Sequence, residues 1–199
     1  LNLVKRCTKV CLSIFVSSPE VGSSAQIEKL QLREKVGMPE LTTRTVTHIM
    51  RSGLFLRELR AICFSAAPLE LLAAPSHAGL TKLQLLWTAG CYSDITKFGR
   101  LPFASAARAL ADAFPRLGKL TDVEIACDTV LFGDYSPDGL VWTLPAATRV
   151  KVAMACPPRI DAPNALSLEL VVDLYTDGEV ACESALQSPR ATSVVIRHD

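Results

Sequence analysis

The sequence predicts an α/β fold: a solenoid with a parallel strand ladder on its concave side and irregular helices or loops on its convex side. A short apolar pattern recurs along the chain, helix signals lie between several copies of it, and polar residues occupy the positions inside it. Of the 199 residues, 49% are hydrophobic and 21% are charged. The chain can therefore bury a large core, and it lacks the composition of a disordered protein.

The recurring pattern is apolar–x–x–apolar–x–apolar, whose last two apolar residues alternate as the buried side of a strand does. Its copies are Cys7/Val10/Leu12, Ile27/Leu30/Leu32, Leu56/Leu59/Ala61, Leu80/Leu83/Leu85, Leu120/Val123/Ile125, Ala147/Val150/Val152, Ala165/Leu168/Leu170 and Ala191/Val194/Ile196. The first positions of successive copies are 20, 29, 24, 40, 27, 18 and 26 residues apart. Five of these seven spacings fall within the roughly 20–29 residues of a leucine-rich repeat. We expect one domain over residues 1–199, made of about eight irregular repeats. Neither end has a polar capping repeat, so we expect it to be part of a longer protein.

Helix signals separate several of the copies. Residues 39–53 begin with a proline and end with a glycine, which is typical of a helix. Residues 105–114 give the strongest helix pattern, and we expect a helical turn at residues 69–72. The connectors at residues 157–164 and 176–189 contain Pro, Asn, Gly and Asp, so we expect loops or single turns there.

One copy, at residues 104–127, is better formed than the others. Its turn, Phe114-Pro115-Arg116-Leu117, and its strand, which ends at Cys127, resemble the C-P-x-L turn and the following strand of cysteine-containing, F-box-type leucine-rich repeats. The segment Cys91-Tyr92-Ser93-Asp94-Ile95-Thr96 is similar to the C-x-x-I-T segment of the same repeats. This resemblance implies a protein-recognition surface within a larger complex. A ubiquitin-ligase role would be an analogy only, because these residues contain no F-box helix bundle.

The repeat pattern also predicts which strand residues face solvent, because side chains alternate across a strand. The first outward column would hold Lys9, Lys29, Glu58, Lys82, Asp122, Arg149, Ser167 and Ser193. The second would hold Cys11, Gln31, Arg60, Gln84, Glu124, Lys151, Glu169 and Val195. The outward positions are mostly polar while the inward ones are apolar, and a register shifted by one residue would mix them.

The outward charges alternate in groups, which favours a protein partner with complementary patches. A nucleic-acid partner would call for an unbroken basic track with stacking aromatics, and the net charge is only +1. The candidate partner-binding residues are Lys29, Gln31, Arg33, Glu58, Arg60, Lys82, Gln84, Asp122, Glu124, Arg149, Lys151 and Glu169. Each of them taken singly fits an ordinary solvated sheet position equally well.

The alternative is a small α/β enzyme with a doubly wound sheet and an unrecognised active site. The 18-residue spacing after Ala147 leaves little room for the crossover helix of such a fold. The common nucleophile, zinc-protease and phosphate-binding motifs are absent, and none of His48, His77 and His198 has a catalytic partner at a recognised spacing. We therefore expect no catalytic residues, no cofactor and no metal site.

Two loops are further candidates for contacts. Residues 88–102 are the extra chain in the longest spacing between repeats, and as a projecting loop they would present Tyr92, Lys97, Phe98 and Arg100. The alternative is an ordinary insertion or a degenerate repeat. Residues 132–140 contain Ser-Pro-Asp-Gly, a strong turn sequence. Trp142 follows that turn and fits either the core or an interface.

The spacing of the cysteines indicates the kind of cellular compartment in which the protein works. Seven are widely spaced without a C-x-x-C pair, and most lie near apolar strands, so we expect free thiols in an intracellular, reducing compartment. The cytoplasm or nucleus fits this better than secretion. No apolar run approaches the roughly 18 residues of a membrane span, so we expect no membrane insertion.

Overall fold

In the computed structural model of the chain, the described residues are 11–16, 26–33, 39–51, 55–63, 67–73, 77–87, 103–127, 139–154, 157–172 and 189–198. The main-sheet strands are β1 (Cys11–Val16), β2 (Gln26–Arg33), β3 (Phe55–Cys63), β4 (Lys82–Trp87), β5 (Asp122–Cys127), β7 (Arg149–Ala153), β9 (Ser167–Val172) and β10 (Ser193–His198). The other elements are α1 (Pro39–Arg51), α2 (Ala67–Ala73), α3 (Phe103–Ala113), the 3-10 helix η2 (Phe114–Arg116), and the short strands β6 (Val141–Thr143) and β8 (Arg159–Asp161).

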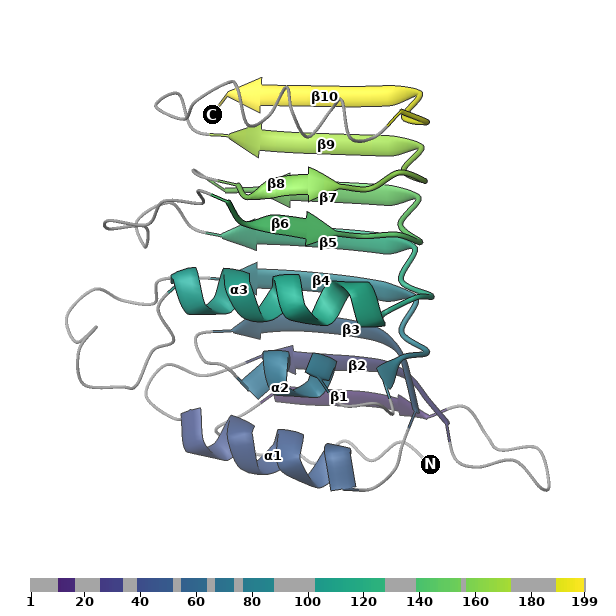
Figure 1. Ribbon diagram of the computed structural model, residues 1–199. Coiled ribbons are helices and arrows are strands. Elements are labelled where there is room, and N and C mark those ends of the chain that lie inside the picture. Colours follow the sequence, from purple (N-terminus) through teal and green to yellow (C-terminus); the bar gives the residue numbers. More distant parts are fainter. Residues whose placement is uncertain are drawn as a thin grey trace.

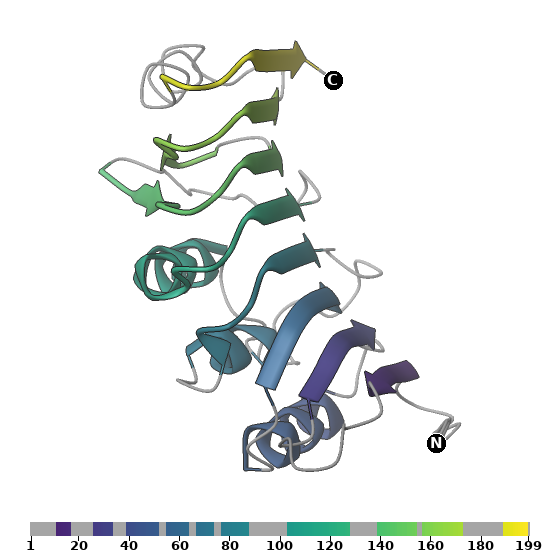
Figure 2. The same ribbon diagram turned by 90° about the vertical axis from the view of Figure 1, so that its right-hand side faces the viewer.

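The protein is α/β, and its main sheet adds strands in sequence order. The order is β1-β2-β3-β4-β5-β7-β9-β10, and every neighbouring pair from β2 to β10 is parallel. A doubly wound sheet would reverse direction at a switch point, and this strand order contains no reversal. Figure 1 shows α1, α2 and α3 on one face of the sheet, with β6 and β8 continuing that layer. In Figure 2 the column of strands is bowed, and the helices lie on its outer side.

The predicted apolar pattern corresponds to the register of the parallel strands. Leu59 pairs with Leu83, Leu83 with Val123, and the same column continues to Val150 and Leu168. These side chains are buried against the helix layer, because alternation sends them all to the same face of the sheet. The buried residues of the repeats form one continuous hydrophobic core.

The first predicted repeat is wrong in direction and register. Its strand runs antiparallel to β2, with Leu12 opposite Leu32 and Ser13 opposite Gln31, so Cys11 lies opposite Arg33 and not in the column of Gln31. Cys7, Lys9 and Val10 lie outside the described residues. Only residues 17–25 separate β1 from β2, a connection that suits an antiparallel pair, whereas a parallel pair needs about a dozen residues or more.

The three predicted helices are present. In α1, Pro39 occupies the first position, where a missing N–H costs nothing, and His48 and Arg51 lie in the last turn, where positive charge is favourable. Val46 and Ile49 of this helix are buried. The α-helical part of α3 ends at Ala113, and Pro115 lies within the 3-10 turn that follows, consistent with a ring that cannot donate an i→i−4 hydrogen bond.

The segment 157–164 is not only a loop, because β8 lies within it. β8 pairs in parallel with β6, with Trp142 opposite Ile160, and both of these side chains are fully buried. This pair occupies the layer that α3 occupies in the preceding repeat (Figure 1). Strands of three residues are too short to produce a readable alternation, which is why the sequence pattern did not predict them.

A tight turn recurs immediately before four of the strands. The N–H of its fourth residue donates to the carbonyl of its first, at 2.9 Å in residues 77–80, 3.0 Å in 117–120, 3.2 Å in 144–147 and 3.0 Å in 162–165. Two of these turns have proline at the second position, Pro145 and Pro163, where its fixed φ is suitable. Both end residues of each turn are buried, so the turn also anchors the start of the strand in the core.

Trp142 belongs to the core, which settles the two possibilities that its sequence context left open. It is fully buried, and its indole N–H donates to the Ala107 carbonyl at 2.9 Å. Its ring also meets Phe114 edge to face, with ring centroids 5.6 Å apart and planes at 83°. Trp142 therefore joins the β6–β8 layer to α3. Across the described residues, no helix has the length and apolar character of a membrane span.

Candidate interaction face

The candidate site is the face of the main sheet that lies opposite α1, α2 and α3, which we call the open face (Figures 1 and 2). Leu59 and Ala61 are buried on the helix side, so Glu58, Arg60 and Ile62 lie on the open face by alternation. The same relation holds along the parallel strands, because their inward positions are in register.

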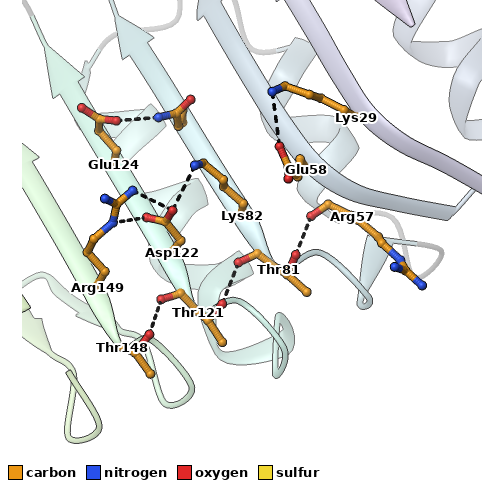
Figure 3. Close-up of polar contacts among 11 residues, drawn as sticks. Lys29, Arg57, Glu58, Thr81, Lys82, Thr121, Asp122, Glu124, Thr148 and Arg149 are labelled. Atoms are coloured by element: carbon orange, nitrogen blue, oxygen red, sulfur yellow. Dashed lines mark hydrogen bonds and ion pairs between the residues drawn. The ribbon is translucent and has the colours of Figure 1, made fainter. Parts of the chain in front are cut away.

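The structure brings the first predicted column together from β2 to β10. Its Cα partners run Lys29, Glu58, Lys82, Asp122, Arg149, Ser167 and Ser193. The charged members pair across the strands. Lys29 Nζ lies 3.5 Å from a Glu58 carboxylate oxygen, and Lys82 Nζ lies 3.2 Å from Asp122. Figure 3 shows this row, in which cations and carboxylates alternate from strand to strand.

Asp122 is the centre of the first column. Arg149 donates to both of its carboxylate oxygens, through Nε at 2.8 Å and Nη2 at 2.7 Å, the fork geometry that guanidinium groups favour (Figure 3). Partial burial raises the pKa of the Asp122 carboxyl, but the hydrogen bonds and charges of Arg149 and Lys82 outweigh it, so the net pKa lies below its usual value. The same contact raises the pKa of Arg149. Asp122 is therefore held ionised between two cations.

The second predicted column is also in register, and its Cα partners run Gln31, Arg60, Gln84, Glu124, Lys151, Glu169 and Val195. The Gln84 amide donates to Glu124 at 2.6 Å. Lys151 Nζ lies 4.0 Å from Glu124 and 3.6 Å from Glu169, so one cation bridges two carboxylates. Lys151, Glu124 and Glu169 therefore form one ion-pair network in this column.

Arg33 does not share a row with the other candidates. Its backbone position is level with Ile62, in a third row that continues through Leu86, Ala126, Ala153 and Val171. Its side chain lies outside what the structure describes. This third row is mostly apolar, and Leu86 is 40% exposed. The sequence contains a signal for this third row, because its residues lie two positions after the second outward column on each strand.

A row of threonines at the start of the strands was also missed. Thr81, Thr121 and Thr148 each donate a side-chain hydroxyl to the backbone carbonyl at the matching position of the preceding repeat, at 3.1, 3.2 and 3.2 Å (Figure 3). Thr192 repeats the arrangement with Leu166 at 3.1 Å. The signal is visible in the sequence, because a threonine directly follows Leu80, Leu120, Ala147 and Ala191. This row extends the hydrogen-bonded ladder beyond the strands.

The remaining predicted candidates lie elsewhere. Residues 88–102, with Tyr92, Lys97, Phe98 and Arg100, are outside the described residues, as are residues 132–138. Gly139 has a φ of 72°, the left-handed conformation expected at the end of the Ser-Pro-Asp-Gly turn. His48 is exposed on α1, and His77 is buried. Among the described residues, no three His, Cys, Asp or Glu side chains cluster as metal ligands would.

No known protein family, curated protein or solved structure matches this chain.

Proposed function

We propose that the chain is a leucine-rich-repeat solenoid that binds a protein partner through its open face, as a recognition subunit or scaffold within a larger complex. The observation that supports this best is the pair of polar columns aligned across the parallel strands. Each column presents alternating charges at strand spacing on a rigid sheet. Such a pattern can discriminate between partners, because a mismatched partner would juxtapose like charges.

The mixture of signs favours a protein partner over a phosphate backbone. Carboxylates separate the cations at Glu58, Asp122, Glu124 and Glu169, and a polyanion would meet each of them unfavourably. We also propose an intracellular, reducing setting, which fits seven widely spaced cysteines without a C-x-x-C pair.

The test reverses the charges at residues 82, 122 and 149 while keeping the pairing of residue 122 with its two neighbours. The variant Lys82→Glu, Asp122→Lys and Arg149→Glu places opposite charges beside one another, with each sign exchanged. Tagged wild-type and variant proteins are used as baits in a lysate of the source cells, and bound proteins are quantified by mass spectrometry. We expect the variant to lose at least about tenfold of the specific partner signal, because reversed charges would face the partner's own.

The matched control is Arg108→Glu on the exposed surface of α3, on the opposite side of the sheet. It should retain the partner signal. Circular dichroism and the denaturation midpoint establish that both variants are folded. Equal capture by the folded triple variant would overturn the open face as the binding surface.

A further inference from the structure

Among the described cations of the two columns, one has no carboxylate partner. In the two columns, five cations (Lys29, Arg60, Lys82, Arg149 and Lys151) accompany four carboxylates (Glu58, Asp122, Glu124 and Glu169). Four of these cations have a carboxylate oxygen within 4.0 Å. In the described part of the chain, Arg60 has no such carboxylate. Arg60 is therefore the one described cation of the two columns that is not in an ion pair.

The surroundings of Arg60 leave its guanidinium available. Its Cα partners on the neighbouring strands are Gln31 and Gln84, which are uncharged. The Gln84 amide is already directed to Glu124, on the side away from β3. The Arg60 side chain is exposed. An incoming anion would therefore not have to displace an existing ion pair there, as it would at Lys82 or Arg149.

Two apolar side chains lie beside Arg60 on the open face. Ile62 lies two residues further along β3 on the same face, and its Cα partner is Leu86 on β4. Leu86 is one of three large hydrophobic side chains exposed in the described part of the structure. We call Arg60, Ile62 and Leu86 the Arg60 patch. Arginine is among the side chains enriched at the positions that contribute most to binding in protein interfaces.

We infer that the Arg60 patch is the anchor point of the open face, and that it binds a protein segment in which an Asp or Glu adjoins a large apolar side chain. This rests on the proposed function. The carboxylate would take the fork of N–H donors of Arg60, which suits its planar geometry. The neighbouring apolar side chain would cover Ile62 and Leu86. The compensated charges of β5, β7 and β9 would then serve to exclude wrong partners.

The test is selection of a random twelve-residue phage-displayed peptide library on immobilised protein. Wild-type protein should enrich peptides with Asp or Glu next to Leu, Ile, Phe or Trp. Arg60→Glu should invert the charge preference to Lys or Arg, and Arg60→Gln should abolish it. Leu86→Ser should keep the acidic preference and lose the apolar one. A merely structural role of Arg60 would not invert the sign.

Arg108→Glu on α3 is the control and should select the wild-type motif. An unchanged acidic motif on Arg60→Glu would overturn the Arg60 patch as the anchor. The triple charge-reversal variant at Lys82, Asp122 and Arg149 is selected against the same library. If the acidic motif is lost with this variant and kept with Arg60→Glu, the open face binds the peptides but Arg60 is not the anchor. Failure of both variants to alter the selected motif would overturn the proposed function as well.

Discussion

His77 is the residue that departs most clearly from its repeat position. It is the first residue of the turn before β4, and the same position in later repeats holds Leu117, Leu144 and Ala162. Only 1% of His77 is exposed, and neither imidazole nitrogen has a hydrogen-bond partner among the residues that the structure describes. Burial lowers the pKa of the imidazole below 6.5, because the charged form loses its hydration.

This burial predicts a pH-dependent stability. Below pH 6.5 the unfolded chain binds a proton at His77 that the folded chain does not, so the free energy of unfolding falls as the pH drops toward the folded-state pKa. The slope is at most about 1.4 kcal/mol per pH unit. His77→Leu should remove this dependence and stabilise the protein at pH 8 by about 1–3 kcal/mol, since an unsatisfied buried group is lost. Urea denaturation at pH 8 and pH 5 measures both effects, and identical pH profiles of the two proteins would contradict the prediction.

Trp142 is the second residue with a defined energetic role. Trp142→Phe removes the hydrogen bond to Ala107, and the smaller ring leaves a void in the core. We expect a loss of about 1–3 kcal/mol in the free energy of unfolding. Phe55→Leu, at a 44% exposed position, is the control and should change stability by about 0.5 kcal/mol or less. Comparable midpoints for the two variants in urea titrations would argue against the core role of Trp142.

At the scale of the elements, the sequence predicted the register of the strands that carry the full apolar pattern. It did not predict the direction of β1 or the existence of the short strands β6 and β8. The pattern around Leu59, Leu83, Val123 and Val150 placed four consecutive strands in their observed register. That success has a physical cause, since a shift of one residue would expose every one of these side chains. β1, β6 and β8 lacked either a full repeat or enough residues to show a period. Their direction and partners depend on loop length and on contacts with α3 and η2.

The cross-strand contacts of Asp122 contribute to holding β4, β5 and β7 together. Asp122→Asn should lower the free energy of unfolding at pH 7 by roughly 1 kcal/mol, a modest loss because the Arg149 side chain is 57% exposed and solvent screens the pair. The folded pKa of Asp122 lies below 3.8, so its contribution is present above that pH and is lost as the pH falls through the folded value.

Urea denaturation of wild type and Asp122→Asn at pH 7, 4 and 2.5 measures this contribution. The difference between the two proteins should be smaller at pH 2.5 than at pH 7. Asp112→Asn, at an exposed position on α3, is the matched control and should show little difference at any of these pH values. A difference that persists undiminished at pH 2.5 would exclude the ion pairs as its source.

At the scale of the whole molecule, the strand order makes stability local. Each main-sheet strand is hydrogen-bonded only to its neighbours in the order, and the described part of the sheet ends at β1 and β10. β4 and β5 have a strand on each side, and α3 lies in front of β4 in Figure 1. Opening at an end breaks one strand interface, whereas opening in the middle breaks two.

Hydrogen exchange should therefore be graded along the sheet. We expect backbone amides of β4 and β5 to exchange at least about tenfold more slowly than those of β1 and β10. Exchange followed by mass spectrometry on the intact chain, with peptides assigned to each strand, gives this profile. Uniform protection from β1 to β10 would show that the sheet opens as one cooperative unit instead.

The sequence by itself determined the parallel ladder, its register and the residues of the two polar columns, because each of these depends on which side chains must leave water. Only the tertiary structure decided how the charges compensate one another. The alternation of Lys82, Asp122 and Arg149 becomes a bridged carboxylate, and Arg60 becomes the unpaired cation, only when the strands lie side by side. Residues far apart in the chain set these distances, and no local pattern encodes them. The direction of β1 and the β6–β8 layer were decided in the same way, by the connection between strands and by packing against α3.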